Sequence, residues 1–181
     1  MKVTPTALAD VLILEPKVFE DARGFFLENY NRRVFREATG LDVEFVQDNH
    51  SRSAKHVLRG LHYQVRRQQG KLMRVTLGEI WDVAVDVRRG SPSFGRWVAN
   101  ALSAASRRMV WIPPGYAHGF LVRSEFAEVQ YKATDYHAPA DERTLLWNDP
   151  ALAIPWPLAG EPVMTDKDRR GTPLAAAETC A

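Results

Sequence analysis

A histidine and two positively charged side chains lie within one short stretch of this chain. Residues 57–64 read Val-Leu-Arg-Gly-Leu-His-Tyr-Gln, and Lys71 follows after a short loop. The imidazole of His62 can exchange a proton near neutral pH, while Arg59 and Lys71 can bind an oxyanion or a phosphate. The same pattern is typical of an ordinary strand with one incidental histidine, so its meaning depends on the rest of the chain.

The spacing of the histidines argues against a metal centre. Metal-binding jelly rolls usually carry two histidines two positions apart, a nearby glutamate and a distant third histidine. No two of the five histidines here have that spacing; they are His50, His56, His62, His118 and His137. We therefore expect no metal and interpret His62 as a general acid or base. A carboxylate would orient its second ring nitrogen, and spacing does not choose among Asp82, Asp86 and Asp168.

Three further side chains have both a structural and a functional interpretation. Lys71 is either an exposed lysine at a strand edge or a cation for an oxyanion. Tyr131 is either a core aromatic or an acid that delivers a proton. His118 follows the proline-stiffened turn at 113–115, where it is either a turn residue or faces a ligand.

Aromatic side chains surround one arginine near the N-terminus. Residues 19–28 read Phe-Glu-Asp-Ala-Arg-Gly-Phe-Phe-Leu-Glu, and Gln-Asp-Asn follows at 47–49. Aromatic faces, amides and carboxylates can stack on and hydrogen-bond a flat base, while Arg23 can bind a phosphate. The alternative is a strand and turn with buried phenylalanines, which the aromatics alone favour.

Length and composition are those of an ordinary globular domain. The 181 residues are 45% hydrophobic and 25% charged, with a formal net charge of +2 that is too small to argue for nucleic-acid binding. No apolar run approaches the roughly 18 residues that a membrane helix needs, and no signal-peptide pattern is present. Cys180 is the only cysteine, which excludes an internal disulfide. We expect one domain over 1–181 and a cytoplasmic protein.

Strands must position most of these residues. One helix is predicted, capped by Asn31 and ending at Gly40. Residues 80–87 alternate in hydrophobic character, as a strand with two different faces does. Frequent strands with little helix between them favour an antiparallel sandwich or jelly roll. Further strands are predicted at 44–49, 71–77, 97–103, 108–112, 119–122 and 127–134, with a short helix near 174–179.

A straight strand would point Arg59 and His62 to opposite faces. Arg59 would share one face with Leu61, and His62 would share the other with Gly60. A bulge at Gly60 would re-aim one of the two side chains. We therefore predict a β-bulge near Gly60 if both side chains serve one pocket, and an unbroken ladder there would refute that idea.

Taken together in this order, the segments resemble the dTDP-4-dehydrorhamnose 3,5-epimerase family, also called dTDP-6-deoxy-D-xylo-4-hexulose 3,5-epimerases. The matching stretches cover nearly the whole chain from about residue 10 to 170, and their joint order and spacing are highly specific. They are residues 19–30, 47–51, 57–64, 71–75, 82–86, 91–97, 111–120, 131–132, 147–150 and 167–168.

The resemblance implies an all-β, cupin-type antiparallel jelly roll with a few short peripheral helices, normally a homodimer and without metal or other cofactor. It implies inversion of C3 and C5 of dTDP-4-dehydro-6-deoxy-D-glucose, giving dTDP-4-dehydro-L-rhamnose in dTDP-L-rhamnose biosynthesis. It makes His62 the general base, paired with Asp168. Tyr131 would be the acid on the opposite face, and Lys71 would bind near the keto oxygen. The residues implied to contact the nucleotide sugar are Phe19, Arg23, Phe26, Glu28, Gln47, Asp48, Asn49, Arg59, Lys71, His118, Glu142 and Lys167.

These residue types suit that reaction. A C4 ketone acidifies the hydrogens on C3 and C5, and removal of one gives an enolate whose charge a cation such as Lys71 stabilises. Inversion needs a proton returned from the other face, so the base and the acid must be different residues, as His62 and Tyr131 are. Neither a redox cofactor nor a metal is required by this chemistry.

Two departures from the family pattern leave alternatives open. His56 stands where the family commonly has glycine, which bears on the geometry of that turn. Residues 164–166 read Met-Thr-Asp in place of the usual Leu-Ser lead into Lys167 and Asp168, which leaves the role of Asp168 open. The alternative functions are inversion of only one centre, isomerisation of the keto group, a catalytically silent sugar-nucleotide-binding cupin, and a metal-dependent cupin oxygenase.

Overall fold

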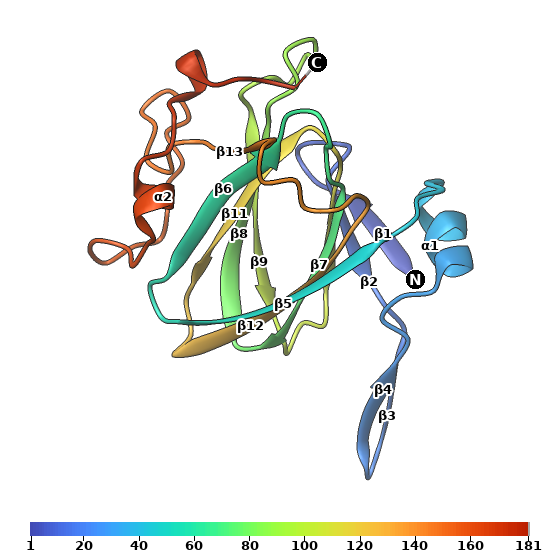
Figure 1. Ribbon diagram of the computed structural model, residues 1–181. Helices are drawn as coiled ribbons and strands as arrows, with labels where there is room; N and C mark the ends of the chain where they lie inside the picture. Colours follow the sequence, from blue (N-terminus) through green and yellow to red (C-terminus); the bar gives the residue numbers. More distant parts are fainter. Residues whose placement is uncertain (181) are drawn as a thin grey trace.

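Two antiparallel sheets pack face to face in the computed structural model, which describes residues 1–180 (Figure 1). In spatial order, the first sheet contains β1 (Lys2–Pro5), β2 (Leu12–Glu15), β10 (Met109–Ile112), β7 (Lys71–Leu77), β12 (Phe126–Ala133) and β5 (Gln47–Ala54). The second contains β13 (Glu142–Thr144), β6 (Leu58–Gln64), β11 (Tyr116–Val122), β8 (Glu79–Asp86) and β9 (Trp97–Ser103). The chain crosses repeatedly between the sheets, which confirms the predicted all-β antiparallel jelly roll.

The alternation of β8 places this strand between two apolar layers. Ile80 and Ala84 face the other sheet and pack in the cluster that contains Met73. Val83 and Val85 face outward, where the C-terminal part of the chain covers them. The predicted two-faced strand is therefore confirmed, and both of its faces are buried.

A β-bulge interrupts the pairing of β6 with β11 at the predicted place. His62 pairs with His118, and Arg59 pairs with Phe120, so three residue steps on β6 match two on β11. Gly60 lies at the irregularity with φ 108°, a conformation that favours glycine. Because cross-strand partners share a face, the bulge points Arg59 and His62 to the same face of the sheet.

The N-terminal region forms one helix and one projecting hairpin. Helix α1 (Arg32–Thr39) begins at Asn31, whose side chain accepts from two backbone N–H groups, and ends at Gly40 with φ 75°, as predicted. Strands β3 (Val18–Asp21) and β4 (Gly24–Leu27) pair only with each other and extend away from the sheets (Figure 1). The idea that this segment buries its phenylalanines is wrong: Phe26 is 69% exposed.

Several predicted boundaries also need correction. Strand β5 starts three residues later than the predicted 44–49 and continues to Ala54, since its polar residues alternate between an exposed and a half-buried face along the edge of the sheet. Strand β11 starts at Tyr116 rather than at 119, because it pairs with β8 from that residue on. The helix predicted near 174–179 is only a 3₁₀ turn, η1 (Leu174–Ala176). Helix α2 (Asp166–Arg169) was not predicted.

The last described residues are tied to the second layer of the fold. The backbone N–H of Cys180 donates to the carbonyl of Val87, and the hydroxyl of Tyr63 donates to the carbonyl of Glu178. The Cys180 thiol is buried, and burial raises its pKa to about 11. Over residues 1–180, no helix has both the length and the apolar character that a membrane crossing needs.

Candidate active site

A small cavity of about 70 Å³ opens between the two sheets at one end of the jelly roll. His62 on β6 and Glu142 on β13 line it from the second sheet, while Lys71 on β7 and Tyr131 on β12 line it from the first. Its remaining lining residues are Tyr63, Gln64, Gln69, Gly115, Tyr116 and His137. Side chains of opposite sheets thus converge on one space, and most of them could carry chemistry.

His62 and Asp168 form a hydrogen-bonded pair at this cavity. The Nε2 atom of His62 lies 2.6 Å from Oδ1 of Asp168, which is 3% exposed. Burial alone would raise the pKa of Asp168, but the hydrogen bond from His62 holds that pKa below its usual value. The structure therefore brings together His62 and Asp168, the two residues that the resemblance pairs, and Asp82 and Asp86 have other partners.

The peripheral helix α2 and the bulge hold Asp168 in place. Thr165 caps α2, because its hydroxyl accepts from the backbone N–H of Asp168 at 3.3 Å. The backbone N–H of Gly60 points at Oδ2 of the same carboxylate at 3.4 Å. Asp168 thus lies 106 residues after His62 in the chain, and its contacts with the Thr165 hydroxyl and the Gly60 backbone N–H orient it.

A second imidazole–carboxylate pair lies deeper, on the strands β11 and β8 of the same sheet as His62. His118 Nε2 is 2.5 Å from Oδ1 of Asp82, and both side chains are buried. Burial lowers the pKa of His118, and the nearby charges of Lys71 and His62 lower it further. The attraction of Asp82 for the imidazolium acts in the opposite direction but is the weaker effect. We therefore expect a neutral His118 at neutral pH. Asp86 instead forms an ion pair with Arg88.

Lys71 brings a desolvated ammonium group to the cavity. Burial lowers its pKa to about 8, although Glu142 and Asp82 attract the charge and oppose that shift. Its Nζ lies 6.0 Å from the centre of the Tyr131 ring. Burial also raises the pKa of Tyr131, so this phenol keeps its proton at neutral pH.

Glu142 and Lys167 form an ion pair at the mouth of the cavity. Burial would raise the pKa of Glu142, but the hydrogen bond and charge of Lys167 lower it below its usual value. His137 approaches the same carboxylate oxygen as Lys167, with Nε2 3.6 Å from Oε2 of Glu142. No pattern in the sequence singled out His137 for this position.

Three more of the predicted residues lie on the neighbouring strands. The side-chain amide of Gln47 donates to Oδ1 of Asn49 at 2.9 Å, and Asn49 is the cross-strand partner of Tyr131. Nε of Arg59 donates to the hydroxyl of Ser53 at 2.9 Å. Gln47 and Arg59 do not line the His62 cavity themselves, and Asn49 lines the neighbouring cavity that shares Tyr131 with it.

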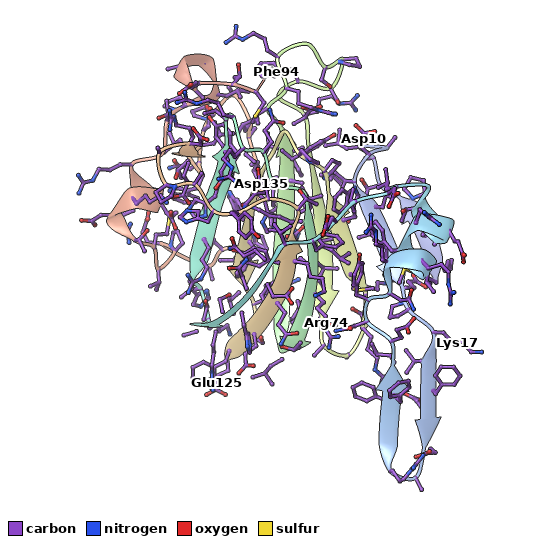
Figure 2. The ribbon with its side chains drawn as sticks, turned by 45° about the vertical axis from the view of Figure 1, so that its right-hand side comes forward. Asp10, Lys17, Arg74, Phe94, Glu125 and Asp135 are labelled. Atoms are coloured by element: carbon purple, nitrogen blue, oxygen red, sulfur yellow. The ribbon has the colours of Figure 1, made fainter. Side chains whose placement is uncertain are left out.

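Five of the predicted substrate-binding residues lie elsewhere. Phe19, Arg23 and Phe26 belong to the β3–β4 hairpin, and Glu28 follows it. Figure 2 shows this hairpin below Lys17 and well apart from Asp135. The backbone carbonyl of Asp135 accepts a hydrogen bond from Gln69, which lines the cavity. Asp48 forms an ion pair with Lys132, at 2.9 Å, and both line a neighbouring cavity that contains Tyr131 but not His62. Within one copy of the chain, these five residues do not meet the His62 cavity.

An antiparallel jelly roll with convergent imidazole, carboxylate, phenol and ammonium groups between its sheets defines a cupin-type protein with a site suited to proton transfer. The family model described as dTDP-4-dehydrorhamnose 3,5-epimerase matches residues 5–176. The chain belongs to that family.

Individual relatives agree with this assignment over almost their whole length. The dTDP-4-dehydrorhamnose 3,5-epimerase of Pseudomonas aeruginosa is 60% identical over 178 residues, which are 98% of either chain. The crystal structure of dTDP-6-deoxy-D-glucose-3,5-epimerase RmlC from Legionella pneumophila, in complex with dTDP-4-keto-L-rhamnose, superposes with a TM-score of 0.95 at 46% identity and covers 98% of this chain and 94% of that one. ChmJ, a 3'-monoepimerase from Streptomyces bikiniensis in complex with dTDP-quinovose, has a TM-score of 0.89 at 34% identity, with 97% and 88% covered.

Proposed function

We propose that this protein inverts C3 and C5 of dTDP-4-dehydro-6-deoxy-D-glucose and so forms dTDP-4-dehydro-L-rhamnose, a step in making dTDP-L-rhamnose. The observation that carries the proposal is the meeting of His62, Lys71 and Tyr131 in one cavity. They are the base, the oxyanion partner and the acid that inversion beside a ketone needs.

His62 removes the proton from the carbon next to the C4 ketone. Its Nε2 is engaged by Asp168, which leaves Nδ1 to accept the proton. Asp168 also stabilises the imidazolium that forms, because it keeps its negative charge at neutral pH. The electron pair of the broken C–H bond forms a double bond to C4, and the C4 oxygen takes the negative charge of the enolate.

Lys71 stabilises that enolate oxygen. Its ammonium group is held in a largely desolvated position, where a charge interaction is stronger than in water. The developing charge is absent in the ketone, so the lysine lowers the barrier rather than merely binding the substrate.

Tyr131 returns a proton to the opposite face of the carbon. The supporting observation is that Tyr131 stands on β12 of the first sheet, whereas His62 stands on β6 of the second. A sugar ring between the two sheets would have the base on one face and the phenol on the other. His62 then releases its proton to solvent and the Tyr131 phenolate takes one up, so the same two steps at the second carbon complete the double inversion.

Proton NMR of the substrate with enzyme in deuterated water tests this function. Deuterium at both C3 and C5, with inversion at both, is the expected result. The match to ChmJ favours inversion at C3 alone as the second candidate, and exchange confined to C3 would establish it instead. Unchanged activity after exhaustive dialysis against a chelator would support the proposed independence from metals.

A homodimer would bring the hairpin residues into use. Phe26 and Phe19 are exposed on a hairpin that has no other strand to pair with, and exposed aromatic patches mark interaction surfaces. We propose that each hairpin supplies Arg23, Phe19 and Phe26 to the cavity of a second copy. The resemblance implies that these residues contact the substrate, but within one chain they do not reach the His62 cavity. A second copy of the chain would account for both points, which supports the proposal.

Mixing two impaired variants tests the shared site. His62→Ala removes the base and Arg23→Ala removes a contact from the hairpin. A mixed dimer contains one site with neither change, so mixing after unfolding and refolding restores up to about a quarter of normal activity. No restoration, or a monomer by light scattering with full activity, would refute the shared site.

A further inference from the structure

Arg107 joins the projecting β3–β4 hairpin to the body of the jelly roll. Its Nη1 lies 2.5 Å from Oε1 of Glu20 on β3, and its guanidinium carbon lies 4.2 Å from the ring centre of Phe25 on β4. Over residues 1–180, no other side chain outside the hairpin forms a hydrogen bond or an ion pair with residues 18–27. One arginine therefore contacts both strands of the hairpin.

The turn that carries Arg107, between β9 and β10, is cross-linked by its own serines. The N–H of Ser106 donates to Oγ of Ser103 at 3.1 Å, and Oγ of Ser106 donates to the carbonyl of Ser103 at 2.9 Å. The N–H of Ala104 donates to the carbonyl of Gly78 at 3.0 Å, which ties the turn to the sheet. Arg107 has φ 53°, in the left-handed region that few residues other than glycine adopt. The backbone thus gives no reason for an arginine here, and its side-chain contacts do.

The base of the hairpin is loosely packed against the first sheet. A cavity of about 120 Å³ lies between them, and its lining includes Phe25, Leu27, Val75, Thr76, Arg107 and Met109. Because a void offers no packing contacts, few contacts other than those of Arg107 hold the hairpin in one direction. The direction in which the hairpin projects (Figure 1) therefore depends on this arginine.

We propose that Arg107 is a positioning residue, which directs the hairpin so that its exposed side chains reach the nucleotide sugar bound by a second copy of the chain. Those side chains are Phe19, Arg23 and Phe26. The inference rests on the proposed shared site. Arg107 acts through the hairpin and not on the reacting atoms. When the hairpin points elsewhere, the second copy lacks its contacts, so the apparent affinity falls with the fraction of correctly directed hairpins.

Steady-state kinetics of Arg107→Ala test the proposal. Both contacts of the guanidinium are lost, so we expect KM to rise about fivefold. The groups that act on the substrate carbon are unchanged, so kcat should stay within about twofold. Arg108→Ala is the matched control, because Arg108 is the next residue and pairs with Glu15 on β2, at 3.1 Å, instead of with the hairpin. Its KM should be normal.

Two further variants separate positioning from stability. Arg107→Gly suits the φ of 53° better than alanine does, so it should unfold at higher denaturant than Arg107→Ala and yet raise KM as much. Arg107→Lys keeps a charge for Glu20 and for the ring of Phe25, so it should restore most of the affinity. A KM that followed stability across these variants would contradict a positioning role.

A mixed dimer shows on which copy Arg107 acts. When Arg107→Ala is refolded with a large excess of His62→Ala, the intact base of one chain meets the correctly directed hairpin of the other. That site should have a normal KM, whereas a raised KM there would mean that Arg107 acts on its own chain and would overturn the inference. So would a normal KM in Arg107→Ala alone, if Arg23→Ala raises it. If Arg23→Ala leaves KM unchanged, the shared site itself fails and the inference with it.

Discussion

Gly60 and Gly119 face each other across β6 and β11 at a distance that leaves no room for a side chain on either. A Cβ atom on Gly60 would lie 2.5 Å from the carbonyl oxygen of His118, and one on Gly119 would lie 2.6 Å from that of Arg59. The bulge that directs Arg59 and His62 to one face of the sheet therefore depends on two glycines that are 59 positions apart in the chain.

Substitution of Gly60 by alanine should damage both the fold and the site. The added Cβ meets backbone atoms and φ is 108°, so we expect the free energy of unfolding to fall by about 3 kcal/mol. Denaturant unfolding measures this. Gly160→Ala is the control, because its Cβ meets nothing within 4 Å. Equal stability of the two variants would show that the bulge tolerates a side chain.

The pH dependence of kcat should report the ionisation of Lys71. Its ammonium form stabilises the enolate and is lost as pH rises through about 8, so kcat should fall above that pH. Lys71→Arg keeps its charge to far higher pH, so its slower reaction should lose the alkaline decline. A decline that persists in this variant would assign the ionisation to another group.

The buried charge of Lys71 should also destabilise the folded protein at neutral pH. The difference between its ordinary pKa of 10.5 and about 8 corresponds to about 3 kcal/mol against folding while the lysine is charged in both states. Lys71→Met should therefore raise the free energy of unfolding at pH 7 by up to about that amount. Above pH 8 the folded protein loses the proton more readily than the unfolded chain, so the advantage should shrink toward pH 10.5. Urea unfolding at pH 7 and pH 10 measures both values, and an equal gain at the two pH values would contradict this explanation.

Tyr131→Phe should separate proton removal from inversion. His62 can still remove a proton and return deuterium to the same face, so we expect exchange in deuterated water with retained configuration. Inversion should fall by about 100-fold or more, since the opposite acid is lost. Proton NMR distinguishes the two outcomes. Tyr30→Phe changes a tyrosine that does not line the His62 cavity, so this variant should invert normally. Full inversion by Tyr131→Phe would remove this residue from the acid role.

Local signals in the sequence were enough to predict much of this fold. Alternation defined β8, capping residues defined both ends of α1, and the need to unite Arg59 with His62 predicted the bulge at Gly60. The polar edge strand β5 was misjudged, because its residues give little hydrophobic period.

The long-range partners were harder to predict, since side chains far apart in sequence leave no local signal of their pairing. Residue types offered three carboxylates to His62, and only the resemblance selected Asp168; the structure gives Asp82 to His118 instead. His137 was missed because its position depends on glutamine contacts from two other strands. The exposed hairpin around Phe26 was misjudged for a different reason: aromatic residues in a short strand do not reveal whether that strand packs on the sheets or projects away from them.

The buried thiol of Cys180 can report local unfolding near the end of the described chain in each of these variants. A thiol reagent meets this single sulfur only after the last residues leave Val87 and Tyr63, because both its burial and its raised pKa protect it in the folded protein. Labelling rates in increasing denaturant would therefore time the opening of the outer layer, with no engineered probe and no other cysteine to confuse the signal.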